Sequence, residues 1–180
     1  VGSGTDALKI PLRAAGVGYG DEVITTANSF WAVVGAITEV GAFPVLVDVG
    51  LDMQMDPDLL LEAISPKTKA IVPVHLAGNV TNMEPIMKIA KSRGLYVFED
   101  GCQSQGAHRG GKQVGSWGDA TAFSMHPLKI LNVWGDGGVI VTDNNKLDDQ
   151  IRVRCERGWT SVADGSGVVQ LVPFHGERRS

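Results

Sequence analysis

Residues 70–100 read AIVPVHLAGNVTNMEPIMKIAKSRGLYVFED, and this stretch decides the fold. Its first apolar run predicts a strand at 70–74, and the spacing of its later apolar residues predicts a helix at 83–92. Gly94 suits the end of that helix, and a second apolar run predicts another strand at 96–99. A strand, a helix and a strand in this order are typical of a parallel sheet that is covered on both faces.

The same alternation runs along most of the chain. Further strands are expected at 22–25, 44–49, 120–124 and 139–142, and further helices at 5–15, 30–40, 57–64 and 146–157. We therefore predict an α/β fold with a largely parallel sheet. Ligands of such sheets bind beyond the carboxyl ends of the strands, so candidate functional residues are those that follow a strand.

The composition indicates a globular chain that acts on small molecules. Of its 180 residues 43% are hydrophobic and 20% are charged, and the formal net charge is −4. With no block of Lys and Arg, these values argue against nucleic acid or an anionic membrane as the main partner. No apolar stretch approaches the roughly 20 residues that span a bilayer, and the N-terminus lacks a signal-peptide pattern, so we expect a cytoplasmic location. Cys102 and Cys155 are expected to be free thiols.

Lys129 is the first candidate for chemistry, in the run FSMHPLKILNVWGDGG at 123–138. Apolar neighbours on both sides predict a poorly solvated amine, and desolvation favours the neutral form that attacks a carbonyl. The alternative is a surface lysine whose methylene stem covers apolar neighbours. The run therefore suggests a lysine that forms a Schiff base, without proving it.

The run GSGTDAL at 2–8 predicts an anion site at a helix start. Gly4 allows close approach of the backbone, and Thr5 adds a hydroxyl beside free N–H groups, which together suit a phosphate. An ordinary helix cap and a dinucleotide-binding turn are the alternatives. Against the dinucleotide turn, Asp21 and Glu22 begin a predicted strand, whereas an acid that binds ribose belongs at a strand end.

Histidines do not predict a metal site in this sequence. His75, His108 and His126 lie on different loops, without the i, i+4 spacing of helical zinc ligands and without a companion carboxylate motif. We therefore expect no metal.

Asp100 ends a predicted strand in the run VFEDGCQSQGA at 97–107, where it could pair with a ligand cation or cap a loop. Together with the phosphate-type helix start and the spacing from Ser124 to Lys129, this run resembles the large domain of fold-type I pyridoxal phosphate enzymes. Within them the sequence is most similar to the DegT/DnrJ/EryC1/StrS sugar aminotransferases. The resemblance covers about residues 2–158. Its further support comes from the runs GDEVITT, VGAFPVLVDV, AIVPVHLAGN and GDGG.

The resemblance implies a three-layer sandwich with a mostly parallel mixed sheet, as in the large domain of aspartate aminotransferase-like proteins. It also implies pyridoxal 5′-phosphate as cofactor. Lys129 matches the lysine that forms the internal aldimine and later moves a proton between the substrate carbon and the cofactor C4′. Asp100 matches the residue that keeps the pyridine nitrogen protonated, and Gln103 matches the residue that contacts the phenolate oxygen.

Other positions match the residues that hold the cofactor in place. Phe30 matches the aromatic residue that stacks on the ring, with the adjacent Trp31 as the alternative and core packing as a simpler explanation. The phosphate cradle is matched by Gly4, Thr5 and Ser124. Ser124 could instead cap its loop. Apart from the resemblance, His126 and Trp134 are expected at the substrate entrance because they lie close to Lys129 in the chain, with core or interface packing as the alternative for Trp134.

The implied activity is transamination of a keto-sugar, with glutamate or glutamine as amino donor. The implied acceptor is a nucleotide-linked keto-deoxyhexose or a keto-cyclitol, and the implied assembly is a homodimer. Lysine at position 129 favours transamination over the dehydration that relatives with histidine there perform. We expect residues 1–158 to form a partial large domain and 159–180 an irregular tail, with the C-terminal small domain missing. A noncatalytic sensor or partner domain and an NAD-dependent oxidoreductase remain alternatives.

Overall fold

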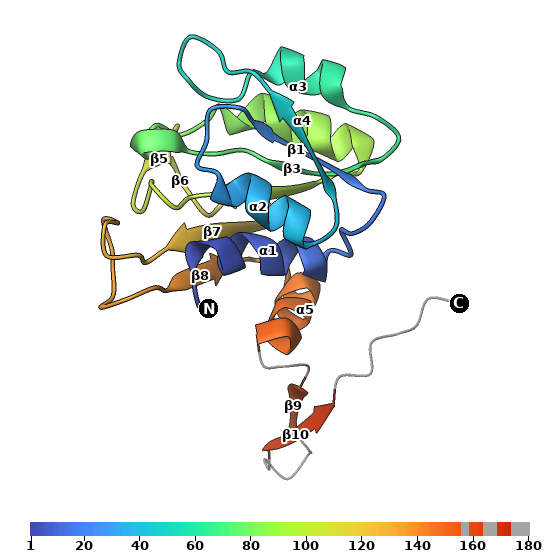
Figure 1. Cartoon of the computed structure of the whole chain (residues 1–180), viewed down its shortest axis with the longest axis vertical. Helices are drawn as coiled ribbons and strands as arrows, with labels where there is room; N and C mark the ends of the chain where they lie inside the picture. Colours follow the sequence, from blue (N-terminus) through green and yellow to red (C-terminus); the bar gives the residue numbers. More distant parts are fainter. Residues whose placement is uncertain (156–158, 164–168, 174–180) are drawn as a thin grey trace.

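The computed structural model describes residues 1–155, 159–163 and 169–173. A six-stranded sheet with the order β2-β1-β3-β4-β7-β8 forms its centre (Figure 1). The strands are β1 (Glu22–Thr26), β2 (Phe43–Val47), β3 (Thr68–Val72), β4 (Tyr96–Asp100), β7 (Ala120–Ser124) and β8 (Gly138–Val141). All neighbours pair in parallel except β7 and β8, which are antiparallel. The predicted α/β fold with a mostly parallel mixed sheet is therefore confirmed.

Helices cover both faces of the sheet and complete the three layers (Figure 1). One apolar cluster joins the sheet to α1 (Gly4–Ala14), α2 (Ala32–Glu39) and α5 (Asn145–Cys155). A second cluster, on the opposite face, joins it to α3 (Pro57–Ala63) and α4 (Met83–Arg93). Because strand side chains alternate between faces, Val97 of β4 enters the second cluster and Phe98 the first.

Local signals explain where the helices begin and end. Asp56 caps α3 by accepting hydrogen bonds from the N–H groups of Asp58 and Leu59, and Pro57 occupies the first turn. Gly94 ends α4 in the left-handed conformation, with φ at 66°. The predicted strands of this sheet, and the predicted helices that cover it, begin and end within a few residues of the observed ones.

Several short elements lie outside the sequence predictions. A hairpin of β5 (His108–Arg109) and β6 (Lys112–Gln113) and the 3-10 turn η1 (Leu76–Gly78) were not predicted. In the segment 159–180, for which an irregular tail was expected, β9 (Trp159–Ala163) and β10 (Val169–Pro173) pair as antiparallel strands. The other residues of that segment lie outside the described part of the chain, and its division from a large domain at 1–158 stays a prediction.

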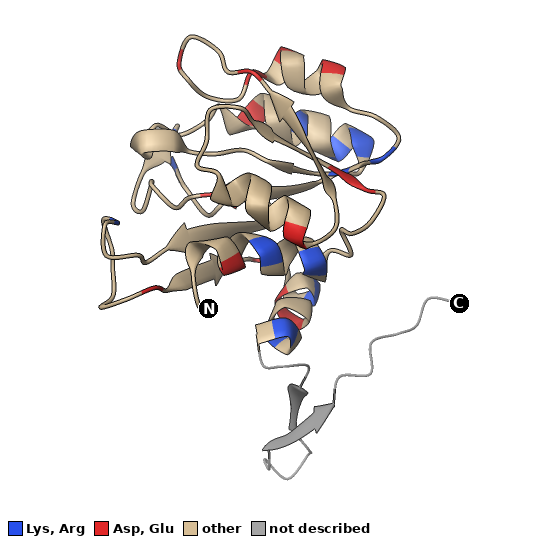
Figure 2. Cartoon of the chain, in the orientation of Figure 1, with Lys and Arg blue, Asp and Glu red and all other residues tan. Residues whose placement is uncertain are grey.

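Acidic and basic residues are mixed on α1, α4 and α5, whereas α2 and α3 carry acidic residues only (Figure 2). α1 carries Asp6 and Arg13, and α4 carries Glu84 together with Lys91 and Arg93. Within the described residues, no helix has both the length and the apolar character needed to cross a membrane.

Candidate functional site

A cavity of about 390 Å³ lies at the carboxyl edge of the sheet, beside the start of α1. It is lined by residues at or after the ends of four strands, β1, β3, β4 and β7, and by the first turn of α1. The predicted site residues among them are Gly4, Thr5, Phe30, Asp100, Gln103, Ser124, His126 and Lys129. Trp134 is not among the lining residues, and its side chain is fully exposed to solvent. The structure thus brings together every residue predicted for the site except Trp134.

The start of α1 packs directly against the end of β7. Ser3 caps the helix, since its Oγ accepts a hydrogen bond from the Asp6 N–H at 3.0 Å. A Cβ on Gly4 would lie only 2.6 Å from Ser124 Cβ, so only glycine allows this approach. The N–H groups of Gly4 and Thr5 belong to the first helical turn, where no intrahelical acceptor exists. This edge of the cavity therefore combines free N–H groups, the positive end of the helix dipole and the Ser124 hydroxyl, as an anion site requires.

Asp100 presents its carboxylate to the cavity from the end of β4. Its backbone is fixed on both sides: the N–H donates to the Pro73 carbonyl at 2.9 Å, and the carbonyl accepts from the His75 N–H at 3.0 Å. Its Oδ1 accepts from the Cys102 N–H at 3.0 Å. The side chain is 5% exposed, so a cation or a protonated ring nitrogen in the cavity would meet a buried and immobile negative charge.

Gln103 is oriented by a hydrogen bond from outside its own loop. Its Oε1 accepts from the Ala77 N–H at 3.0 Å. Ala77 adopts the left-handed conformation, with φ at 54° and ψ at 27°, which non-glycine residues rarely adopt. Since the oxygen of the amide is taken by Ala77, the amide nitrogen is the end of Gln103 left to donate to a ligand.

A series of tight turns holds Lys129 after β7. Ser124 Oγ accepts from the His126 N–H at 3.3 Å, and His126 Nδ1 accepts from the Leu128 N–H at 3.2 Å. The His126 carbonyl then accepts from the Lys129 N–H at 2.8 Å. Both His126 and Lys129 line the cavity, so the turns bring the lysine back towards the strand that precedes it.

The prediction that apolar sequence neighbours keep water away from the Lys129 amine is wrong. Leu128, Ile130 and Leu131 are 88%, 72% and 58% exposed, so these sequence neighbours face solvent instead of burying the amine. Residues 126–128 and 130–136 are all exposed, whereas Lys129 is half-buried. Lys129 lines the cavity together with its neighbours His126 and Leu128 and with residues from distant parts of the chain.

Phe30 and Trp31 occupy different environments after β1. Phe30 lines the cavity and is 54% exposed, whereas Trp31 is 71% exposed and is not among the lining residues. Their ring centroids lie 5.4 Å apart at an angle of 49°. Phe30 is therefore the better placed of the two for stacking on a ligand.

Some lining residues were not identified from the sequence. Cys102 and Asp136 line the cavity, although neither was proposed for the site. Burial and the negative charge of Asp100 raise the pKa of the Cys102 thiol, with Lys129 opposing them, so the thiol stays protonated. Cys102 and Asp136 lie in the two sequence runs that contain Asp100 and Lys129, and this position was the signal that could have identified them.

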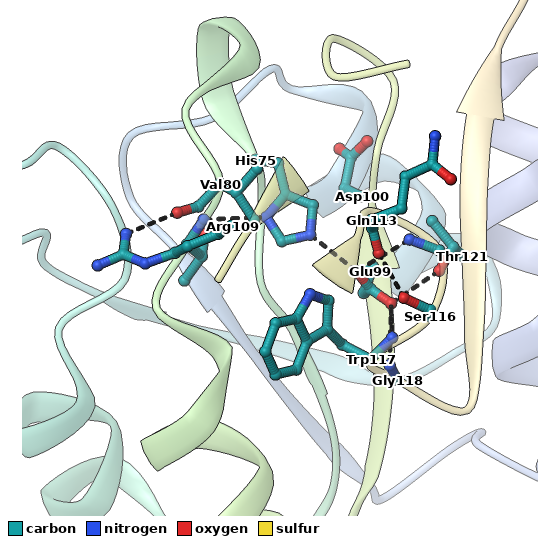
Figure 3. A network of polar contacts seen from close by, with 12 residues as sticks. His75, Val80, Glu99, Asp100, Arg109, Gln113, Ser116, Trp117, Gly118 and Thr121 are labelled. Atoms are coloured by element: carbon teal, nitrogen blue, oxygen red, sulfur yellow. Dashed lines mark hydrogen bonds and ion pairs between the residues drawn. The ribbon is translucent and has the colours of Figure 1, made fainter. Parts of the chain in front are cut away.

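A buried polar network centred on His75 and Glu99 lies next to Asp100 (Figure 3). His75 and Glu99 are fully buried, with His75 Nε2 3.0 Å from Glu99 Oε2. The other oxygen of Glu99 accepts from the Trp117 N–H, the Gly118 N–H and Thr121 Oγ1 at 2.9–3.0 Å. Burial raises the pKa of Glu99, but the hydrogen bonds from His75, Gly118 and Thr121 outweigh it and hold that pKa below its usual value. Within the described part of the chain, no group of three His, Cys, Asp or Glu side chains is placed to hold a metal ion.

Comparisons with known proteins agree with this geometry. Residues 1–172 match the DegT/DnrJ/EryC1/StrS aminotransferase family. A pleiotropic regulatory protein of Geobacillus stearothermophilus is 49% identical over 84% of this chain and 41% of its own length. A dTDP-3-amino-3,4,6-trideoxy-alpha-D-glucose transaminase of Micromonospora megalomicea subsp. nigra is 46% identical over the same shares. The chain thus spans less than half the length of these relatives.

A solved structure supports the same relationship. NtdA of Bacillus subtilis, with bound cofactor PMP, superimposes with a TM-score of 0.80 and is 42% identical, over 84% of this chain and 34% of that one. The residues that match the family model, 1–172, include every residue that lines the cavity. The chain therefore belongs to the DegT/DnrJ/EryC1/StrS aminotransferase family.

Proposed function

We propose that the chain binds pyridoxal 5′-phosphate in this cavity, and that the protein transfers an amino group from glutamate or glutamine to a keto-sugar. One observation carries the proposal: Lys129, Asp100 and Gln103 line one cavity together with a free helix N-terminus. The acceptor that we propose is a nucleotide-linked keto-deoxyhexose or a keto-cyclitol. A transaminase named for a dTDP-linked amino sugar among the relatives supports the first of these. A homodimer is part of the proposal.

The residues present fit the cofactor. The cavity volume of about 390 Å³ is within the roughly 300–1,000 Å³ of small-molecule sites. The missing side chain of Gly4 leaves room for Ser124 beside the free N–H groups, where a phosphate would bind. At the other end, Asp100 offers a buried carboxylate for a ring nitrogen, and the amide nitrogen of Gln103 is free to donate to a ring oxygen.

Each residue then has a defined task. When bound, the cofactor supplies an aldehyde that condenses with amines and a ring that withdraws electrons from the substrate carbon. Lys129 Nζ takes the proton from the carbon that bears the donor amino group and later delivers a proton to the acceptor carbon. Asp100 would hold a proton on the ring nitrogen of the bound cofactor and stabilise the positive charge there. Phe30 covers the ring and excludes water from that side.

Borohydride reduction tests cofactor binding directly. We expect added pyridoxal phosphate to produce a visible absorption band, and reduction to fix the cofactor on the peptide that contains Lys129. The Lys129→Ala variant should lose the band, whereas Lys88→Ala, on α4, should keep it. Label spread over surface lysines in the native chain would refute the proposal.

A noncatalytic role is the second candidate, because one relative is named a pleiotropic regulatory protein. Both roles predict a bound cofactor. Only the transaminase predicts that glutamate or glutamine converts the visible band in the absence of an acceptor. A bound cofactor that no amino donor converts would favour the regulatory role.

A further inference from the structure

The loop from His75 to Thr81 lies between β3 and α4 and contacts Gln103 at the edge of the cavity. It contains η1 and carries the Ala77 N–H that binds Gln103. Both Ala77 and Gly78 adopt positive φ, at 54° and 79°, so the backbone of the loop is held in a conformation that needs support from its surroundings. Neither His75 nor the loop has a role in the proposed chemistry.

His75 closes this loop at its base. Its Nδ1 accepts a hydrogen bond from the Thr81 N–H at 3.2 Å, at the far end of the loop. A ring nitrogen that accepts carries no proton, so the proton resides on Nε2, which donates to Glu99 Oε2 at 3.0 Å. Thr81 is fixed further, because its Oγ1 donates to the Val74 carbonyl at 3.0 Å. The loop is therefore tied at both ends to one buried imidazole.

The closed loop determines how Gln103 faces the cavity. An amide can present either its oxygen or its nitrogen, and these ends differ in whether they accept or donate. The Ala77 N–H can donate only to the amide oxygen of Gln103, so the amide nitrogen is directed to the ligand. Arg109 supports the loop from outside, since its Nη1 donates to the Val80 carbonyl at 2.9 Å (Figure 3).

The geometry points to His75 as a positioning residue that acts through Thr81, Ala77 and Gln103 on the ring oxygen of the cofactor. This inference rests on the proposed function, because it needs pyridoxal phosphate in the cavity. A donated hydrogen bond stabilises negative charge on that oxygen and thereby favours the deprotonated form of the bound chromophore. Loosening the loop should therefore raise the pH midpoint, which is the pH at which half of the bound chromophore is deprotonated, as followed by its visible absorption band. The titratable residues that line the cavity are Asp100, Cys102, His126, Lys129 and Asp136, and none of them is changed in the variants below. Glu99, which faces His75, is unchanged as well.

Two replacements of His75 separate its two contacts. The amide oxygen of His75→Asn can take the place of Nδ1 and keep the Thr81 N–H bonded, but it loses the bond to Glu99. The longer His75→Gln can place its amide nitrogen near Glu99, but leaves the Thr81 N–H without its acceptor. We expect His75→Gln to raise the pH midpoint by about half a unit or more and to weaken pyridoxal phosphate binding about threefold to tenfold. His75→Asn should stay close to the native values in both measurements.

Controls separate positioning from a loss of stability. Ile86→Val, in the apolar cluster on the opposite face of the sheet, lowers the melting temperature without touching the loop, so it should leave the pH midpoint unchanged. Arg109 is exposed, so Arg109→Met should fold and should shift the midpoint in the same direction as His75→Gln, by less. This variant keeps the test decisive if either His75 variant fails to fold.

The outcomes distinguish the inference from the proposed function. If the native chain binds no pyridoxal phosphate, the proposed function fails. If the native chain binds it, but His75→Gln and Arg109→Met leave the midpoint and the affinity unchanged, the positioning role of His75 is refuted. Equal shifts in His75→Asn and His75→Gln would also refute it, because they would assign the effect to Glu99 and not to the loop.

Discussion

Replacing Gly4 by alanine tests the contact between α1 and β7. The new Cβ would lie 2.6 Å from Ser124 Cβ and 3.2 Å from Ser124 Cα. Carbon atoms attract one another at about 3.5–4.0 Å, so the helix start must move away from the strand by roughly 1 Å. Overpacking of this kind costs about 1–3 kcal/mol. The propensity gain of alanine over glycine applies to helix interiors, and Gly4 is the first residue of α1, so we expect the free energy of unfolding to fall by about 1–3 kcal/mol.

The same substitution at Gly35 is the matched control. Gly35 lies inside α2, and a Cβ there would meet Trp31 Cζ3 at 3.5 Å, an ordinary contact distance. Gly35→Ala should therefore stabilise the chain by about 0.5–1 kcal/mol.

Urea unfolding followed by circular dichroism measures both changes, provided that the slope with denaturant stays constant. Gly4→Ala should also weaken pyridoxal phosphate binding about tenfold or more, because the free N–H groups proposed to bind the phosphate move with the start of α1. A Gly4→Ala chain as stable as the native one would refute the close contact.

Three further predictions concern charged groups. Glu99→Gln should lower stability at neutral pH by about 2 kcal/mol or more, and the difference from the native chain should shrink in acid, because a lowered pKa contributes stability that is lost as pH falls through it. Urea midpoints at about pH 7 and pH 3.5 check this, and a constant difference would contradict it. Burial raises the pKa of Asp119, whose Oδ2 accepts from the Val97 N–H at 2.8 Å. Asp119→Asn should therefore gain stability relative to the native chain as pH rises above about 4, and a relative loss over that range would contradict the burial effect. Asp56→Ala removes the cap of α3 and should cost about 0.5–2 kcal/mol in thermal or urea unfolding, with Asp58→Ala as the milder control.

The sheet and most of the site were predictable for one physical reason. Apolar runs mark buried strands, and the carboxyl ends of parallel strands meet at one edge, so Asp100 and Ser124 had to approach each other. The path of a loop cannot be inferred in this way. Sequence neighbours placed Lys129 among apolar residues, whereas the turns around it expose them.

The network of His75 and Glu99 was not predictable either. Its two residues are 24 positions apart, and no periodic pattern indicates that a buried histidine and a buried glutamate will meet. The hairpin at 108–113 escaped prediction because each of its strands has only two residues, all exposed. Its Gly110 and Gly111, with φ at 58° and 79°, were the available signal.

The neighbouring acids Glu99 and Asp100 give β4 a way to hold its register. Side chains of adjacent strand residues point to opposite faces, so one carboxylate meets donors from distant turns while the other faces the cavity. A slip that moves Glu99 into the place of Asp100 would put Phe98 where Glu99 was and leave the N–H groups of Gly115, Trp117 and Gly118 without a carboxylate. The opposite slip would offer these donors only the shorter side chain of Asp100. The penalty for those unpaired donors makes the misaligned strand pairing unfavourable. Glu99, which does not line the cavity, thereby selects the strand alignment in which Asp100 can contact a ligand there.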